Sequence, residues 1–217
     1  RDDAMSATFV GTRTASATDS AGVSRSVNHE GRGGWTAKDY CTVASKNGVT
    51  NAFFNPITQK FDYSYYLANS GVDTPDMVLV LLGTNDSGNT ADTVMPYINE
   101  MITSITSDAS TPKCGVGQCV PVYKWAFADY QYSFFENKFE IRKAIGNTYG
   151  YDVTQQTFAI PLFVNFDSVN DFGSIVAADR LNDENHRVVT DPVHPNDRGY
   201  FRMADTLFAN IKAAYES

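Results

Sequence analysis

The stretch Asp76–Asp86, DMVLVLLGTND, joins the longest purely apolar run of the chain to a glycine and three polar residues. An uninterrupted apolar run of this kind is typical of a parallel strand that is buried on both faces. The glycine lets the chain turn sharply at the end of the strand, so the polar side chains after it emerge at the carboxyl edge of the sheet. In open α/β sheets, ligands bind at this edge.

Strand-like and helix-like patterns alternate around this stretch. Further strands are predicted at Ala7–Val10, Val120–Trp125 and Phe158–Val164, which are rich in β-branched and aromatic residues. Apolar residues at helical spacing predict three helices, and the stripes are interpreted as core. The stripes are Val94, Ile98, Met101, Ile102 and Ile105, then Phe135, Phe139 and Ile145, and last Tyr200, Met203, Ala204, Leu207, Phe208 and Ile211. We expect Pro96 in the first turn of its helix. This alternation predicts an α/β fold with a parallel sheet.

Composition narrows the class of protein. The 217 residues fit one domain, and no linker, repeat or low-complexity stretch divides them. A net charge of −8 with scattered Lys and Arg argues against a nucleic-acid partner. The apolar run Met77–Leu82 is far shorter than the roughly 20 residues of a membrane helix, so no membrane partner is expected.

The three cysteines leave two interpretations open. Cys114–Cys119, CGVGQC, is interpreted as a glycine-rich loop whose cysteines either form a disulfide, which would indicate an oxidising compartment, or remain free thiols. Cys41 is expected to be a buried, small apolar residue. A zinc site is disfavoured because no second Cys or His pair lies at ligand spacing, and no metal or cofactor is expected.

Two polar motifs carry residue types suited to catalysis. Asn85, after the apolar run, has an amide that can donate a hydrogen bond to a developing oxyanion without carrying charge. An Asx turn that closes the strand would explain Asn85 and Asp86 equally well. In the second motif, DPVHP, the Asp191 carboxylate can reach Nδ1 of His194, fix the tautomer and leave Nε2 as a general base. The alternative is a helix-capping Asp beside an incidental surface His, with Pro195 as the first helical residue.

Together with the glycine-rich stretch His29–Thr36, HEGRGGWT, these motifs resemble three blocks of the SGNH (GDSL-like) hydrolase family, in the family's order. The resemblance runs from about Phe9 to the last helix. It implies a flavodoxin-like three-layer α/β/α sandwich with a mainly parallel sheet, and a serine ester hydrolase mechanism. In that mechanism a serine attacks the ester carbonyl, and His194, oriented by Asp191, acts as general base and then general acid.

The resemblance also implies an oxyanion hole and substrate contacts. The donors would be the N–H of the serine, the N–H of Gly34 and the side chain of Asn85. Gly34 is chosen because one residue and then a Thr follow it, as in the family pattern. His29 and Asp86 are expected to contact substrate, and the alternative for His29 is an exposed loop residue.

The sequence departs from the family at the nucleophile. No Gly-Asp-Ser turn follows a first strand, because Ser20 lies in a polar loop and Ser6 precedes a strand. We therefore expect 1–217 to be a single SGNH hydrolase domain that lacks its N-terminal strand, nucleophile turn and first helix, with a separate N-terminal segment that completes it. The missing strand would lie between strands near Phe9 and Val80, whose edges its loss would expose. The alternative is a pseudoenzyme.

Three functions remain open from the sequence. The first is a carbohydrate esterase that removes acyl groups from a glycan or small-molecule ester, outside the cell. The second is a GDSL-type lipase or other acyl-ester hydrolase, and the third is a non-catalytic, glycan-binding pseudoenzyme. An aromatic cluster either forms a sugar platform or packs in the core, which we favour. Its members are Phe53, Phe54, Phe61, Tyr63, Tyr65 and Tyr66.

Overall fold

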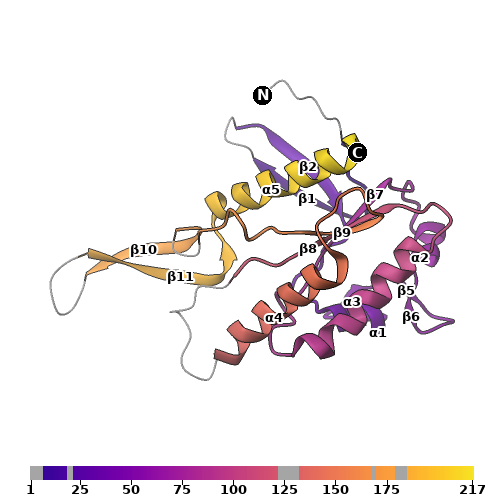
Figure 1. Cartoon of the computed structure of the whole chain (residues 1–217), viewed down its shortest axis with the longest axis horizontal. Coiled ribbons are helices and arrows are strands. Elements are labelled where there is room, and N and C mark those ends of the chain that lie inside the picture. The colour runs from indigo at the N-terminus through magenta and orange to yellow at the C-terminus, as the bar shows by residue number, and fades with distance from the viewer. Residues whose placement is uncertain (1–6, 19–21, 122–131, 168–169, 179–184) are drawn as a thin grey trace. The chain divides into compact units, whose positions relative to one another are not determined.

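The computed structural model describes residues 7–18, 22–121, 132–167, 170–178 and 185–217 (Figure 1). It forms two compact units, each built from two stretches of the chain. The first unit contains Arg1–Val78 and Tyr97–Cys114, and the second contains Leu79–Pro96 and Gly115–Ser217. Strands β7 and β8 and helix α3, whose bounds are given below, each have residues in both units. The single-domain organisation stays a prediction.

The first unit begins with a polar hairpin. Strand β1, Arg13–Thr18, pairs antiparallel with β2, Ser24–His29. The strand predicted at Ala7–Val10 does not form, so this prediction was wrong. After it, the chain comes so close to the end of β2 that a Cβ on Gly11 would lie 2.5 Å from the His29 carbonyl carbon.

Small elements complete the first unit around an aromatic core. Helix α1, Ala37–Thr42, starts at Thr36 with a capping box closed by Asp39, and α2 is Tyr63–Ser70. Between them lie β3 (Ser45–Lys46), β4 (Val49–Thr50), β5 (Phe54–Asn55) and β6 (Lys60–Phe61).

The aromatic cluster belongs to that core. The ring centroid of Phe53 lies 4.8 Å from that of Phe61 and 4.2 Å from that of Tyr66. Phe61 and Tyr66 are each 4% exposed and Tyr63 is 1% exposed. Core packing is therefore confirmed for these three residues.

A three-stranded parallel sheet has the order β7-β8-β9. Its strands are β7 (Met77–Leu81), β8 (Lys113–Gly117) and β9 (Thr157–Ile160). Helix α3, Ala91–Thr106, connects β7 to β8, and α4, Tyr132–Tyr149, connects β8 to β9. The predicted α/β fold with a parallel sheet is thus confirmed. Pro96 lies in the second turn of α3 rather than in the first.

Strand β8 corrects two predictions. The sequence Cys114–Cys119 is not a glycine-rich loop, because its first half is a buried strand, and all three cysteines are free thiols. A Cβ on Gly115 would lie 2.6 Å from Ile160 Cδ1, so side chains from the neighbouring strands fill the space above the glycine. The predicted strand at Val120–Trp125 is not observed at Val120, and 122–125 lie outside the described residues.

One face of the sheet is covered unevenly. A Cβ on Gly115 would meet Leu79 and Ile160, which places these side chains on the same face. Leu79 is 36% exposed and its strand neighbour Leu81 is 48% exposed, whereas Ile160 is 1% exposed. Strand β7 therefore presents apolar side chains to solvent at one edge of the sheet.

The second unit ends with a long hairpin and a helix. Strands β10, Phe172–Ala178, and β11, Asn185–Pro195, pair antiparallel, and α5, Asp197–Glu216, follows directly. Helices α4 and α5 both contact β9 and lie on opposite faces of it (Figure 1). None of the helices in the described part of the chain is long and apolar enough to cross a bilayer.

The apolar stripe predicted as core on α5 is covered only in part, because Met203, Leu207 and Ile211 are half-buried. Tyr200, Ala204 and Phe208 are exposed, whereas the buried residues are Gly199, Thr206 and Ala214. On α4, Ile145 is buried as predicted, but Phe139 is 49% exposed. On α3, all five stripe residues are buried, so that prediction is confirmed.

Candidate active site

Asp191 and His194 form a hydrogen-bonded dyad at the end of β11. Nδ1 of His194 lies 2.9 Å from Asp191 Oδ2, and Oδ1 accepts the backbone N–H groups of Val193 at 3.0 Å and His194 at 2.9 Å. Because a carboxylate can only accept, Nδ1 carries the proton and Nε2 presents a lone pair. This is the tautomer that a general base needs.

A bulge in β11 extrudes the histidine. Phe172 pairs with Pro195 and Gly173 pairs with Asp191, so Pro192, Val193 and His194 have no partners on β10. Bulges of this kind re-aim side chains at the ends of strands. The extra residues bring the His194 ring back over the Asp191 carboxylate while both flanking residues stay in the ladder.

The dyad is open to solvent. The side chain of His194 is 71% exposed and that of Asp191 is 47% exposed. The pKa of Asp191 lies below its ordinary value, mainly because the carboxylate accepts the backbone N–H of His194, with smaller contributions from Val193 and the imidazole. The carboxylate is therefore ionised at neutral pH and can stabilise an imidazolium.

The turn after β7 separates the roles of its polar residues. Asp86 is 2% exposed, and its Oδ2 accepts the N–H of Gly83 at 3.1 Å, so its carboxylate closes an Asx-type turn. Ser87 is fully buried and donates to the carbonyls of Gly83 and Thr84. Asn85, directly before these two buried residues, is exposed. The buried turn holds Asn85 at the carboxyl edge of the sheet, where the family resemblance predicts an oxyanion donor.

The glycine-rich stretch in the first unit forms a tight turn. Trp35 N–H donates to the Arg32 carbonyl at 3.4 Å, and Gly34 has a φ of +75°, which only glycine adopts easily. The Arg32 side chain is 3% exposed and forms a 3.1 Å ion pair with Glu30. Lys46 Nζ donates to the Gly34 carbonyl at 3.0 Å. Gly34 is therefore held at an exposed turn, as its predicted role requires.

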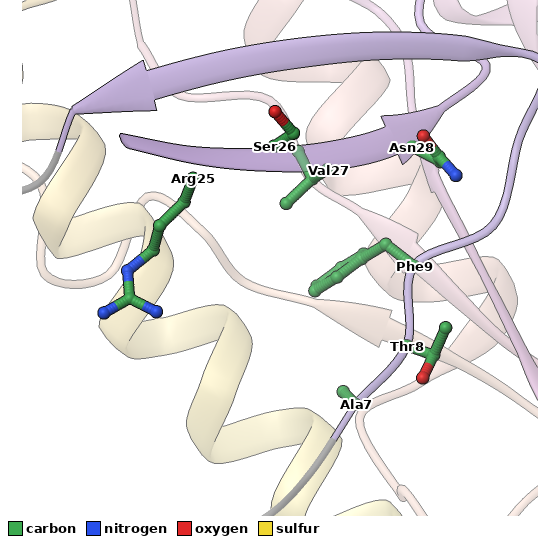
Figure 2. Close-up of a pocket in the computed structure, with 7 residues that line it drawn as sticks. All are labelled: Ala7, Thr8, Phe9, Arg25, Ser26, Val27 and Asn28. Carbon is green, nitrogen blue, oxygen red and sulfur yellow. The ribbon is translucent and has the colours of Figure 1, made fainter. Parts of the chain in front are cut away.

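His29 stands at the end of a strand that borders a pocket. Its Nδ1 accepts the N–H of Gly31 at 2.9 Å. An open pocket of about 540 Å³ runs along β2, and Figure 2 shows the Phe9 ring beneath Val27. The other residues that line it are Ala7, Thr8, Arg25, Ser26 and Asn28. His29 is next in the chain to this lining, and its contact with substrate stays a prediction.

The structure brings some predicted site residues together. Asp191 and His194 are in direct contact, and Asn85 and Asp86 belong to the same unit as the dyad. Gly34 and His29 belong to the first unit. The buried position of Asp86 favours a role in the turn, so its predicted substrate contact has no support here. Ser6 and Ser20 lie outside the described residues.

A buried polar group on α4 was not predicted. Lys138 on α4 is 1% exposed, and its Nζ has no hydrogen-bond partner within the described part of the chain. Burial is the main cause that lowers the pKa of Lys138; the nearby Cys119 opposes this shift, and Arg142 adds to it. Lys138 lies three residues before the buried Ile141, on the face of α4 that packs in the core, but a polar residue type gives no signal of such burial.

Comparison with solved structures shows the fold. A carbohydrate esterase family 3 protein from Talaromyces cellulolyticus matches with a TM-score of 0.53 at 19% identity, over 88% of this chain and 73% of that chain. Est24, a carbohydrate acetylesterase from Sinorhizobium meliloti, matches with a TM-score of 0.51 at 14% identity, over 86% and 78%. The aryl esterase of M. smegmatis matches with a TM-score of 0.52 at 15% identity, over 87% and 78%.

These likenesses show that the chain shares the α/β fold of these solved structures. No protein-family model matches the sequence, and no curated protein matches it significantly.

Proposed function

We propose that this chain carries the acid–base and oxyanion-stabilising part of a serine carboxylic ester hydrolase that deacylates carbohydrates. The observation that carries the proposal is the Asp191–His194 dyad, with its 2.9 Å contact at Nδ1. His194 Nε2 takes the proton of the nucleophile and returns it to the leaving alcohol, while Asp191 holds the ring and stabilises its charged form.

In this proposal one oxyanion donor, Asn85, belongs to the same unit as the dyad, and the family resemblance predicts a second, Gly34, in the first unit. Asn85 offers a neutral amide from an exposed position that Asp86 and Ser87 hold from below. Gly34 offers its N–H from a turn anchored by Arg32 and Lys46. Neutral donors at fixed positions suit an anion that forms only in the transition state.

The nucleophilic serine comes from a polypeptide segment that is not among the described residues. Within those residues, the hydrogen bonds of His194 go to Asp191, and the ring is 71% exposed. The exposed Leu79 and Leu81 on β7 offer an edge and an apolar face for such a segment. A strand added there would cover apolar surface and deliver the residue that follows it to the carboxyl edge of the sheet.

An acylated carbohydrate is the substrate that we favour. Two solved structures of the same fold are named as carbohydrate esterases, and a third as an aryl esterase. Small acyl groups fit a dyad on an open surface better than long acyl chains do, because a long chain requires an apolar channel. Extracellular localisation stays a prediction, and free cysteines give it no support.

The test uses the protein purified from the cells that make it, together with any polypeptide that accompanies it. It is treated with a fluorophosphonate probe and assayed on acetylated xylo-oligosaccharides and on an aryl palmitate. We expect covalent labelling of a serine outside residues 1–217 and release of acetate, with little hydrolysis of the palmitate. Labelling of a serine within 1–217 would refute the external nucleophile, and preference for the palmitate would indicate a lipase.

A non-catalytic protein is the second candidate function, favoured by the exposure of the dyad. In that case the probe labels nothing, acetate release stays at the rate of the buffer, and acetylated oligosaccharides still bind in calorimetry. His194→Ala separates the two functions, because it abolishes turnover in an esterase and leaves glycan binding unchanged in a pseudoenzyme.

A further inference from the structure

We propose that Asp171 is a positioning residue for His194, acting through the first turn of α5; this inference rests on the proposed function. Asp171 precedes β10 and is 0% exposed. Its Oδ1 lies 3.3 Å from Arg198 Nε, and its Oδ2 lies 3.4 Å from Arg202 Nη1. Oδ2 also accepts the backbone N–H of Asp167 at 2.6 Å. A buried carboxylate between two cations of one helix ties that helix to the start of β10.

The backbone around Asp171 is clamped to the residue that caps α5. Asn196 donates its N–H to the Asp171 carbonyl at 2.8 Å, and its Nδ2 donates to the carbonyls of Asn170 and Phe172, both at 2.9 Å. Its Oδ1 accepts the N–H of Gly199 at 3.0 Å, as an N-cap does. One side chain therefore joins the start of β10 to the start of α5.

The two segments are in close contact at Gly199. A Cβ on this residue would lie 2.6 Å from the Asp171 carbonyl oxygen and 2.8 Å from Pro195 Cβ. The absence of a side chain lets the first turn of α5 approach Asp171 closely enough for Arg198 and Arg202 to reach the carboxylate. The contact is formed by backbone atoms, so it has little room to adjust.

This anchor lies immediately after the catalytic histidine. His194 is separated from Asn196 only by Pro195, which pairs with Phe172 in the ladder. On its N-terminal side, His194 is held by Asp191, which pairs with Gly173. The regular ladder of β11 ends at Val189, two residues before Asp191. The bulge with His194 thus hangs between two fixed points, and Asp171 secures the second of them. Without its charge, the first turn of α5 loosens and the imidazole samples positions away from Asp191.

The experiment reads the histidine directly in the full chain and needs no turnover. Ring ¹⁵N shifts of His194 are recorded by NMR for the unaltered protein, for Asp171→Asn, and for Asp205→Asn, the same change at an exposed position of α5. We expect a single tautomer with Nδ1 protonated in the first and third. In Asp171→Asn the Nδ1 and Nε2 shifts should move toward each other, as in an imidazole that exchanges tautomers.

Turnover gives a second readout in the active enzyme. Asp171→Asn should lower kcat about 10-fold, because small displacements of a catalytic group are costly, and should leave KM unchanged because Asp171 does not touch substrate. A structural role alone would reduce the amount of folded enzyme without altering the tautomer of the folded fraction.

Unchanged ring shifts in folded Asp171→Asn would overturn the proposal. If that variant does not fold, Arg198→Gln removes one of the two ion pairs at a side chain that is 56% exposed, where folding is not at stake. It should shift the ring signals in the same direction by a smaller amount, and no shift would again overturn the proposal. Failure of the proposed function appears instead as absent probe labelling while the tautomer effect persists.

Discussion

Asn85 and Asp86 are adjacent residues that the fold treats in opposite ways. The carboxylate of Asp86 accepts a hydrogen bond from the Gly83 N–H inside the turn, whereas Asn85 is exposed at the sheet edge. The sequence offered an Asx turn and an oxyanion donor as competing explanations, and the structure assigns the turn to Asp86. The turn explanation therefore applies to Asp86, which no spacing rule could have decided, and the oxyanion role of Asn85 stays a prediction.

Asn85→Ala tests the donor role. In the active enzyme we expect kcat to fall by roughly 10²–10³-fold, the usual loss for one oxyanion donor, with KM little changed. Steady-state kinetics on an aryl acetate measure both. Asn89→Ala, at an exposed position after the same turn, is the control and should keep full activity. A change in KM alone would mean that Asn85 binds substrate in the ground state.

The lowered pKa of Asp191 predicts how the dyad responds to acid. Because the folded pKa lies below 3.8, the carboxylate adds stability at pH values above its unfolded pKa, and this is lost as pH falls through the folded pKa. The carboxyl ¹³C shift of Asp191 should titrate with a midpoint below 3.8.

His194→Ala should leave the Asp191 midpoint below the ordinary value, because the largest cause is a backbone N–H that alanine retains. A midpoint restored fully to the ordinary value would show that the imidazole, and not the backbone, dominates the pKa of Asp191.

At the scale of elements, the sequence predicted periodic patterns better than packing partners. The helix at α3 follows from its hydrophobic period and the strand at β7 from its apolar run, and both elements form. The prediction that this strand is buried on both faces was wrong, since Leu79 and Leu81 are exposed. Strand β8 was missed because glycines usually mark loops, whereas here Gly115 and Gly117 admit side chains from neighbouring strands. The stripe on α5 was correctly periodic, but a single helix cannot reveal whether anything covers its apolar face.

Tyr200→Ser on α5 should therefore be mild. Tyr200 is 51% exposed, so we expect the free energy of unfolding to fall by less than about 1 kcal/mol. Ile98→Ala on α3, at a residue that is 1% exposed, is the comparison and should cost about 2–5 kcal/mol. Urea titrations followed by circular dichroism measure both. A large loss for Tyr200→Ser would show that α5 buries its stripe in solution.

For the whole molecule, the exposed side of β7 is the feature that the composition could not predict. The motifs predicted the contact between Asp191 and His194 and the turn after β7, because each depends on neighbouring residues in the chain. In the proposed enzyme, the placement of the nucleophile depends on what pairs with β7, which is a relation between distant segments. Substitutions at the exposed Leu79 and Leu81 can test whether another segment pairs with β7.

Leu81→Lys tests that relation. Because Leu81 is 48% exposed, the stability of the chain alone should change by less than about 1 kcal/mol. Turnover of the completed enzyme should fall by at least about 10-fold, since a lysine would have to be buried by the added segment. Val164→Lys, at a residue that is 63% exposed, is the control and should leave turnover unchanged. Full activity of Leu81→Lys would contradict strand addition at this edge.

The three buried thiols can be used to measure how often each part of the chain opens transiently to solvent. Burial raises the pKa of Cys41, of Cys114 to about 12, and of Cys119, so at neutral pH the thiols are protonated and shielded from alkylating reagents. Modification then requires a transient opening, and its rate measures how often that opening occurs. Cys41 and Cys114 belong to the first unit and Cys119 to the second. Cys114 and Cys119 are only five residues apart in the chain. Unequal alkylation rates at these two cysteines would show that the two units open independently.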